Sequence, residues 1–502
     1  MERTELERAT KSELYELAQE HGIEGRSAMS KPELLDALRD TDGVVGDGAR
    51  LASRFEAFER LAEARARGEV RSTPRILEGD ERRLHVRQTL REDHQTRIAN
   101  RAEGAEAKFD ALADSCYKFF RGTALLFYRD IAGDDAWMPT VLNLGDVHPG
   151  NFGVMPSVDD DVPIFSVNDF DEAAYAPFTW DLKRGAVGFV LAAETEGGLP
   201  DKRQRKLVRN FVRGYVAGMQ EFAAEGNERD LQFRLDNSPA LIRELIEDAN
   251  ESRSGWLDGE YYDEFRRGFR ADGELVPVSS RTDEFQQIID ELVETNDIEV
   301  PSRAAGMRVK DVAIRRHQGT ASLGLERFYV LIEGPARDAA DDLIIELKRA
   351  RRSALAGLVP PSEFTVRGEA GRIAHAQRVQ LVRGDTFFGH VDIDGESFLS
   401  RERAPYRGDL DLDDLSWSDW KSYAGICGRT LAHAHSMSDE GAGTIDRDIE
   451  PDILTAIGNV DLFVDDIERF AVEAAARVRR DHEHYRADHA LGAFEAVDLA
   501  FH

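Results

Sequence analysis

The sequence predicts a mixed α+β protein with two lobes, preceded by a small helical domain. Residues 303–402 contain several short runs in which apolar and polar residues alternate, a pattern that is typical of strands. Long stretches before and after them carry apolar residues at helical spacing. A Gly/Asp-rich segment at 41–50 separates the first helical unit from the rest of the chain.

The composition indicates a soluble globular protein, with 41% hydrophobic and 32% charged residues. The length of 502 residues allows about two to four domains. No apolar run approaches the roughly 20 residues that span a bilayer, and no secretory signal is visible. Cys116 and Cys427 lie far apart and follow no disulfide or metal-ligand pattern. We therefore expect a cytoplasmic protein without membrane contact.

The chain is strongly acidic, with a formal net charge of −31. The acidic residues are spread along it, lysine is scarce, and arginine supplies most of the positive charge. Uniform acidity of this kind is typical of halophilic proteins, whose hydrated carboxylates keep them in solution. The alternative is an ordinary acidic protein from a GC-rich genome. In both cases a large nucleic-acid interface is disfavoured, because it needs a basic face.

Residues 1–42 are expected to form a unit of two short helices. Leucines recur at near-helical spacing in the first half, and S-K-P-E at 30–33 has the N-cap and early proline of a second helix. The run K-S-E-L-Y-E-L-A-Q-E-H-G-I-E-G-R-S-A-M-S-K-P-E-L-L-D-A-L resembles the N-terminal domain of the Rho termination factor and its SAP-like relatives. That resemblance implies nucleic-acid contact, whereas the many acidic residues favour a protein-docking or accessory module.

The rest of the chain divides into four parts: a linker and helix (43–74), a large lobe (75–302), a β-rich lobe (303–402) and a helical C-terminal part of the large lobe (403–502). The aromatic segment at 118–130 enters the core of the large lobe. There Lys118 and Arg121 either face a phosphate or flank an aromatic packing layer.

The large lobe is organised around two polar loops that each follow an apolar run. The first, N-L-G-D-V-H-P-G-N-F-G, carries Asp146, His148 and Asn151. The second, N-D-F-D, carries Asp169 and Asp171. If both runs are strands joined by a short connection, carboxylate and amide oxygens meet at one point, as divalent-metal and phosphate chemistry requires.

These side chains match the parts of a phosphoryl-transfer site. Asp146 would orient or deprotonate an acceptor hydroxyl, and Asn151 and Asp169 would hold Mg²⁺. A calcium-binding or purely structural loop is the alternative. His148 is a possible metal ligand, although we expect its ring to pack beneath the turn. Asp171 would support the metal or cap the loop.

Asp181 lies at the start of a helix whose apolar sequence predicts burial. An aspartate in this position caps the helix or anchors the catalytic loop.

The β-rich lobe is expected to fold in the order β-β-β-α-β-β. Its last two strands form a hairpin at 387–402, with Asp394-Gly395 at the turn.

This lobe contains two candidate nucleotide-binding features. The turn H-Q-G-T-A-S-L-G carries Gly319, Ser322 and Gly324 between two strands, where glycine lets backbone N–H groups approach a phosphate. A plain hairpin has the same pattern. Lys348 lies in an apolar strand, where a lysine needs an anionic partner such as a nucleotide phosphate. The alternative is an edge-strand lysine that extends to water.

Two of the motifs, L-G-D-V-H-P-G-N-F-G and V-N-D-F-D, resemble the Brenner and metal-binding motifs of aminoglycoside-phosphotransferase-like and other atypical protein-kinase-fold enzymes. More closely, the combined pattern resembles the family called domain of unknown function 2252. The matching pieces, spread over most of residues 75–490, are F-F-R-G, G-D-V-H-P-G-N-F-G, N-D-F-D-E, P-F-T-W-D-L-K-R, G-T-A-S-L-G, E-L-K-R-A and C-G-R-T-L-A-H-A-H.

The resemblance implies a two-lobed, protein-kinase-like fold that binds ATP and Mg²⁺. It implies that Asp146 is the catalytic aspartate, that Asn151 and Asp169 are the metal ligands, and that Lys348 contacts the phosphates beneath a glycine-rich loop at 319–324.

The order of these motifs differs from that of ordinary kinases. The glycine-rich loop and the lysine follow the catalytic loop here, whereas they precede it in kinases. The helix T-L-A-H-A-H-S, which resembles the helix before the catalytic loop, lies near the C-terminus. We therefore expect a circular permutation with 303–402 as the N-lobe. Glu369 is a candidate partner for Lys348, since the expected helix otherwise offers His375 and Gln377.

The sequence thus favours an ATP- and Mg²⁺-dependent phosphotransferase that acts on a small molecule. One alternative is a nucleotide-binding pseudokinase or regulatory protein whose N-terminal unit recruits nucleic acid or a protein. A further alternative is nucleotidyl transfer on the same fold.

Overall fold

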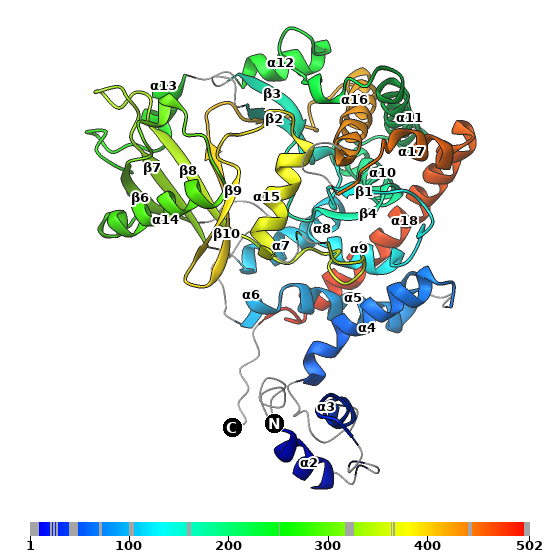
Figure 1. Ribbon diagram of the computed structural model, residues 1–502. Coiled ribbons are helices and arrows are strands. Elements are labelled where there is room, and N and C mark those ends of the chain that lie inside the picture. Colours follow the sequence, from blue (N-terminus) through cyan, green and yellow to red (C-terminus); the bar gives the residue numbers. More distant parts are fainter. Residues whose placement is uncertain are drawn as a thin grey trace.

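The computed structural model shows a helical lobe and a sheet lobe joined along one side (Figure 1). It describes residues 10–20, 23, 26, 29–39, 49–69, 73–99, 105–157, 162–249, 252–316, 326–362, 364, 367–439 and 444–495. The content of 54% helix and 14% strand confirms the α+β class. Among the described residues, no helix combines the length and apolar character needed to cross a bilayer.

The N-terminal unit consists of α2 (Lys11–Glu20) and α3 (Lys31–Arg39). The two helices pack through four fully buried side chains, Leu14, Ala18, Leu34 and Leu38. The Glu33 carboxylate accepts a hydrogen bond from the backbone N–H of Ser30, as a residue in the first turn of a capped helix does.

The helical lobe contains most of the remaining helices. They are α4 (Ala49–Ala66), α5 (Gly79–Asp93), α6 (Gln95–Ala99), α7 (Ala105–Asp114), α8 (Cys116–Arg121), α9 (Ala124–Ile131), α10 (Phe178–Thr195), α11 (Asp201–Glu225), α12 (Ala240–Asp248), α16 (Trp417–Ser436), α17 (Glu450–Ile457) and α18 (Val460–His489). Helix α10 is buried along most of its length, and its stretch 185–193 is entirely apolar, as expected. It therefore forms the centre of the lobe, with α11 and α18 packed beside it.

Two small antiparallel sheets carry the polar loops of this lobe. Strand β1 (Thr140–Asn143) pairs with β4 (Ala174–Pro177), and β2 (Phe152–Pro156) pairs with β3 (Pro163–Val167) and with β11 (Gly408–Asp409). The expectation of two consecutive strands is therefore wrong in one respect. A 3₁₀ turn at Pro149–Asn151 redirects the chain after the first strand, so that a further strand forms before Asp169.

The sheet lobe contains six antiparallel strands in the order β5-β6-β7-β8-β10-β9. They are β5 (Leu275–Pro277), β6 (Val309–Arg315), β7 (Arg327–Ile332), β8 (Leu343–Arg349), β9 (Gly389–Ile393) and β10 (Glu396–Arg403), and α15 (Gly368–Gln380) lies between β8 and β9 in the chain. The order β-β-β-α-β-β is thus as expected. The β9–β10 hairpin turns at Asp394 and Gly395, which both have positive φ, as a two-residue turn requires.

The sheet lobe begins earlier in the chain than the predicted boundary at 303. Helix α14 (Thr282–Thr295) covers one face of the sheet, with Phe285 packed against Phe328. Helix α13 (Arg253–Glu260) contributes Trp256 to the apolar cluster on the other face. The sequence did not predict these two helices as part of the lobe. Their few apolar, core-facing positions lie among many acidic residues that face solvent.

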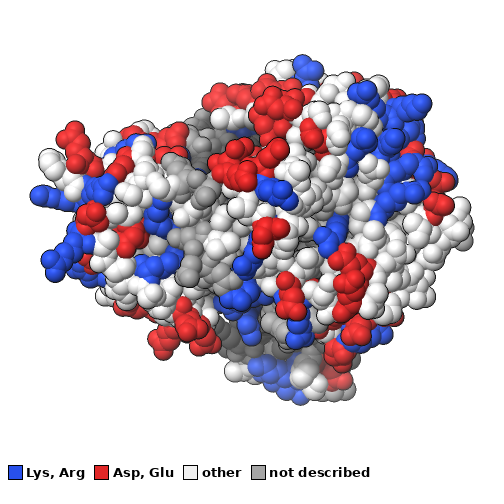
Figure 2. Space-filling model, turned by 90° about the horizontal axis from the view of Figure 1, so that it is seen from above, with Lys and Arg blue, Asp and Glu red and all other residues white. Residues whose placement is uncertain are grey.

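The surface carries both signs of charge despite the large net negative charge. Figure 2 shows acidic side chains in groups that basic and neutral side chains separate. Such a surface favours solubility without forming one large attractive patch.

Helices α11 and α16 approach so closely that only glycine fits at one contact. A Cβ atom on Gly428 would collide with the backbone carbonyl oxygen of Phe211 in α11. Three residues earlier, a Cβ atom on Gly425 would have no neighbour nearer than the carbonyl oxygen of Asn210, at 3.9 Å. The two glycines therefore differ sharply in what a side chain would meet.

We expect Gly428→Ala to destabilise the protein by about 1–3 kcal/mol, because the collision forces two helix backbones apart. Gly425→Ala is the matched control in the same helix, and alanine there should leave stability unchanged or raise it by about 1 kcal/mol. Scanning calorimetry at constant salt measures both melting temperatures. Equal shifts in the two variants would contradict the close contact.

An acidic group is buried where α16 ends. The Glu228 and Glu450 side chains are buried, and Asp439 is half-buried beside them. Burial first, and then the charges of Asp439 and Glu228, raise the pKa of Glu450 to about 7. One of its carboxylate oxygens has no hydrogen-bond partner. Ionised Glu450 therefore opposes folding.

A pH-dependent difference in stability should follow. The folded-state pKa of Glu450 lies above its unfolded value of about 4.3, so the wild type loses stability as pH rises from about 4 to about 7. Glu450→Gln should remove this loss and raise the melting temperature at pH 8 more than at pH 5. Glu473→Gln, an exposed change on α18, is the control. An equal effect at both pH values would contradict the shifted pKa.

Candidate functional site

A buried aspartate holds the first polar loop in place. The Asp181 carboxylate, on the first turn of α10, accepts hydrogen bonds from the backbone N–H groups of Leu144 (2.7 Å) and Gly145 (3.0 Å). The His435 Nε2 atom of α16 lies 3.2 Å from the same carboxylate. Gly145 has φ of +88°, and a Cβ atom there would collide with the Glu172 carbonyl oxygen. Asp181 thus anchors the loop that leads into Asp146.

The side chain of Asp146 is positioned by Arg184. The Arg184 guanidinium donates twice to Oδ1 of Asp146, at 2.6 and 2.9 Å, and once to the carbonyl oxygen of Phe120. It also lies over the Phe120 ring, 3.5 Å from the ring centroid. Because Arg184 is fully buried, it fixes one oxygen of Asp146 and leaves Oδ2 available. Sequence analysis did not assign Arg184, although its place three residues after Asp181 puts both on one helix face.

His148 packs beneath the turn. The backbone N–H of Gly150 donates to its Nδ1 atom at 3.1 Å, and the Tyr117 hydroxyl lies 3.5 Å from the same atom. Burial, with help from the nearby Arg121 and Arg184, holds the pKa of His148 well below its usual value. The ring is therefore neutral and supports the loop.

Asn151 and Asp169 supply oxygens that fit a hard divalent cation. The Asn151 amide nitrogen donates to the Asp146 carbonyl oxygen at 2.7 Å, which leaves its own carbonyl oxygen as the atom for a ligand. The Asp169 carboxylate accepts from the backbone N–H of Asp171 at 3.1 Å. Burial and the neighbouring Asp171 raise the pKa of Asp169, so a cation at this carboxylate would relieve an unfavourable charge.

Within the described part of the chain, no three His, Cys, Asp or Glu side chains form a metal-binding group. An amide and one carboxylate, completed by water and phosphate oxygens, is nevertheless a ligand set that suits Mg²⁺.

Lys348 joins the two lobes through an ion pair with Asp171. Its Nζ atom lies 2.5 Å from Oδ2 of Asp171, across 177 residues of sequence. Burial opposes the charge of Asp171, but Lys348 outweighs it and holds the pKa of this carboxyl at about 2. The suggestion that Glu369 pairs with Lys348 is wrong. Glu369 instead binds Arg372, at 2.9 Å.

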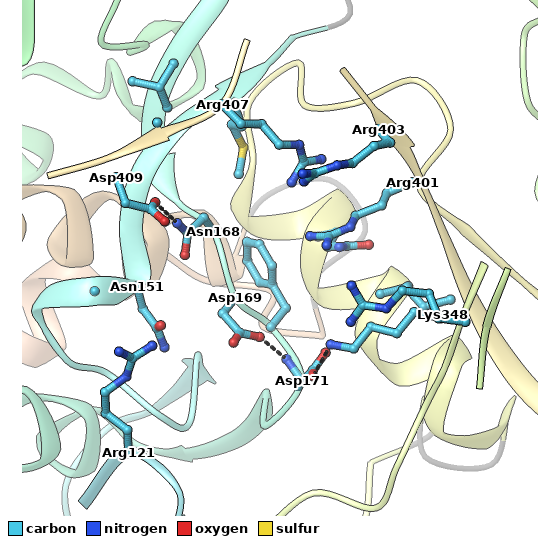
Figure 3. A pocket seen from close by; sticks show the side chains of 18 residues that line it. Arg121, Asn151, Asn168, Asp169, Asp171, Lys348, Arg401, Arg403, Arg407 and Asp409 are labelled. Atoms are coloured by element: carbon cyan, nitrogen blue, oxygen red, sulfur yellow. Dashed lines mark hydrogen bonds and ion pairs between the residues drawn. The ribbon is translucent and has the colours of Figure 1, made fainter. Parts of the chain in front are cut away.

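A pocket of about 460 Å³ lies between the lobes, within the usual size range for small-molecule sites (Figure 3). Its polar and charged lining residues are Arg121, Asn151, Asn168, Asp169, Asp171, Arg327, Lys348, Gln377, Arg401, Arg403, Arg407 and Asp409. Asp146 is not part of this lining, but its backbone carbonyl oxygen accepts a hydrogen bond from Asn151, which is. Gly319, Ser322 and Gly324 lie outside the described residues.

The arginines that β10 and the segment after it contribute to this pocket were not expected from the sequence. A usable signal was present: R-E-R at 401–403 places two arginines on one face of a strand. Arg121, considered earlier as a phosphate contact, also lines the pocket. Lys118 does not belong to the lining residues.

One family model matches the part of the chain that contains the pocket. The sequence model described as "Uncharacterized protein conserved in bacteria (DUF2252)" matches residues 101–488. The chain belongs to the DUF2252 family. This confirms the resemblance that the motifs suggested, and the DUF2252 match includes all the residues that line the pocket.

The model of the Rho termination factor N-terminal domain matches residues 5–41, the region of α2 and α3. No curated protein and no solved structure gives a significant match.

We expect Asp181→Asn to destabilise the loop that carries Asp146. The amide group faces two backbone N–H donors with a single acceptor oxygen, so at least one buried hydrogen bond to a charged group is lost, at about 1.5–3 kcal/mol. Hydrogen exchange of the peptide spanning 140–151 should become faster, and the melting temperature should fall. Asp201→Asn, on the exposed start of α11, serves as the control. Unchanged exchange in Asp181→Asn would show that the carboxylate does not anchor the loop.

Proposed function

We propose that this protein is an ATP- and Mg²⁺-dependent phosphotransferase that acts on a small-molecule acceptor. The observation that carries the proposal is the ion pair between Lys348 and Asp171. It joins the candidate phosphate-binding lysine to the candidate metal-binding loop in a single pocket that Asn151 and Asp169 also line. A lysine, an amide and a carboxylate in one cleft are the recurring parts of phosphoryl-transfer sites.

The layout of the sheet lobe supports a kinase-like arrangement. The segment containing the glycine-bounded turn joins β6 to β7, the lysine lies on β8, and α15 follows before the last two strands. Kinases likewise place a glycine-rich loop first, a lysine on the third strand and a helix after it. The order along the chain is then that of a circular permutation, with the sheet lobe after the polar loops.

The position of α16 is consistent with the permutation. The Ser438 hydroxyl, just beyond this helix, accepts a hydrogen bond from the backbone N–H of Leu142 in β1, at 2.9 Å. His435 contacts Asp181 from the same helix. Helix α16 therefore lies beside the strand that leads into the Asp146 loop, where the resemblance to kinases would place it.

In the proposed reaction, Asp146 receives the proton of the acceptor hydroxyl on Oδ2, while Arg184 holds its other oxygen. The acceptor oxygen forms a bond to the terminal phosphorus, and the bond from that phosphorus to the ADP oxygen breaks. Lys348 leaves Asp171 to contact the phosphates. Mg²⁺, held by Asn151 and Asp169, would neutralise phosphate charge.

A nucleotide-binding protein without catalytic activity is the second candidate, and one observation favours it. Helix α15 offers Gln377 to the pocket, where kinases place the glutamate that pairs with the lysine. The neutral amide does not hold Lys348, which binds Asp171 instead.

Calorimetry tests the proposal directly. ATP should bind the wild type in the presence of Mg²⁺, and binding should weaken at least about tenfold when EDTA is added or in Asp169→Asn, because a charged metal ligand is lost. Asp392→Asn, an exposed change on β9, should bind as the wild type does. Absence of Mg²⁺-dependent ATP binding at the salt concentration that keeps the protein folded would exclude the proposed function.

Asp146→Asn separates catalysis from binding in the same experiment. It should retain ATP binding but lose at least about 100-fold in the rate of ATP consumption, since it removes a general base. If the wild type binds ATP but consumes none with any of a panel of hydroxyl acceptors, the second candidate is favoured.

A further inference from the structure

Arginines line one side of the pocket in a row. Alternate residues of a strand face the same way, so Arg401 and Arg403 of β10 both reach the pocket, and Arg407 reaches it from the segment before β11. Figure 3 shows Arg401, Arg403 and Arg407 along one side, with Lys348 and Asp171 in a different part. The row thus extends the charged lining well away from the Lys348 ion pair.

Among the described residues, Arg403 and Arg407 form no ion pair with a carboxylate, although Glu346, Asp385 and Asp409 lie near enough to offset part of their charge. Arg401 pairs with Glu346, which also binds Arg327. Arg403 donates to a neutral oxygen, the Tyr261 hydroxyl, at 3.3 Å, and the nearby Glu346 carboxylate partly offsets its charge. Arg407 donates to the carbonyl oxygen of Glu402 at 2.7 Å.

The environment of Arg407 is unfavourable for an isolated cation. Its Nε atom is buried and has no hydrogen-bond partner. Burial first, and then the charges of Arg401 and Arg403, lower the pKa of Arg407 to about 9. Buried cations of this kind are normally compensated by an anion. The charge of Arg403 acts on that of Arg407, and both side chains line the same pocket.

A neutral group in the same pocket is also without a partner. Gln377, on α15, lines the pocket and is 5% exposed, and its side-chain oxygen has no hydrogen-bond partner. An amide held at a pocket wall in this way is available to a hydroxyl or to a second polar group of a ligand.

The charge of the pocket is opposite to that of the chain. Among its described lining residues, six are Lys or Arg and three are Asp, whereas the whole chain has a net charge of −31. A cationic cleft in an acidic protein concentrates anions from solution. The excess positive charge therefore indicates that the pocket binds an anionic ligand.

Arg403 lies some distance along the sheet from Lys348, the candidate nucleotide-binding lysine. Lys348 pairs in register with Leu399, and Arg403 lies four residues further along β10. At about 3.3 Å per residue, this places their backbone positions about 13 Å apart along the strand. The pocket can therefore hold two anionic groups at once, one near Lys348 and one between Arg403 and Arg407.

We propose that Arg403 and Arg407 form a subsite for a phosphate monoester carried by the acceptor, so that the substrate is an already phosphorylated small molecule. Two guanidinium groups that form no direct ion pair match the charge of a phosphate monoester, about −1.5 to −2, better than that of a single carboxylate. Their forked N–H groups fit phosphate oxygens. This assignment of the acceptor rests on the proposed phosphotransferase function, whereas the anion subsite itself does not.

The overall chemistry remains that of phosphate transfer to a hydroxyl. A second hydroxyl of the phosphorylated acceptor forms the new P–O bond, and its proton passes to Asp146. The bond between the terminal phosphorus and the ADP oxygen breaks. The subsite phosphate is not altered, and its only role is to position the acceptor.

Calorimetric titration with inorganic phosphate, at constant potassium chloride, tests the subsite. Phosphate should bind the wild type and Lys348→Met alike, and at least about tenfold more weakly to the double variant Arg403→Gln/Arg407→Gln, since two charged hydrogen-bonding groups are lost. Arg447→Gln, an exposed arginine that pairs with Asp452, is the control and should bind as the wild type does. Phosphate binding that the double variant retains, or that the wild type lacks, would overturn the subsite.

Titration with MgATP tests the acceptor subsite and the phosphotransferase function separately. The double variant should bind MgATP within about threefold of the wild type. If the double variant loses MgATP binding, the arginines bind the nucleotide. The assignment of the acceptor then fails, while the phosphotransferase proposal stands. If the wild type binds phosphate through the arginines but does not bind MgATP, the subsite stands and the proposed function fails.

A measurement on the wild type alone covers the case in which the double variant does not fold. With MgATP at saturation, added phosphate should raise the melting temperature further, because two separate sites are filled. Competition between the two ligands would instead show that they share one site, and would overturn the proposal.

Discussion

The two lobes are held together by charged side chains of the sheet lobe that form ion pairs and hydrogen bonds with residues 171–173. Lys348 pairs with Asp171, Arg351 pairs with the buried Glu172, and Arg372 donates to the carbonyl oxygens of Asp171 and Ala173. Removing one member of such a set leaves a buried charge unpaired, which costs far more than an exposed ion pair contributes. The pocket exists because these contacts keep the sheet lobe against the polar loops.

Where local patterns dominate, the fold was predictable. The apolar run of α10, the alternation in β6 to β10 and the Asp394-Gly395 turn each predict their own element, because periodicity and turn chemistry act over few residues. The pairing of β1 with β4 was not predictable in this way. It depends on a 3₁₀ turn at 149–151 and on a distant partner strand, and neither is encoded by spacing alone.

The same distinction applies to the candidate site. Asp146 and Asn151 stand on one short loop, and Asp169 stands on the next. Their closeness in the sequence made it predictable that they lie near one another. The partner of Lys348 was not predictable, since the sequence suggested Glu369, whereas the fold places Asp171 beside Lys348 and Arg372 beside Glu369. Arg403 and Arg407 were hidden for a related reason. In an acidic chain rich in arginine, a pocket-lining arginine looks the same as one that pairs on the surface.

The packing of α18 has a consequence for how the chain is made. This last long helix lies against the early helices of the body: His482 contacts the carbonyl oxygen of Leu112, Tyr485 donates to that of Phe109, and Asp481 pairs with Arg82. Synthesis proceeds from the N-terminus, so α5 and α7 emerge from the ribosome long before the helix that covers them. The face of these early helices that α18 covers therefore stays open until translation has passed residue 485.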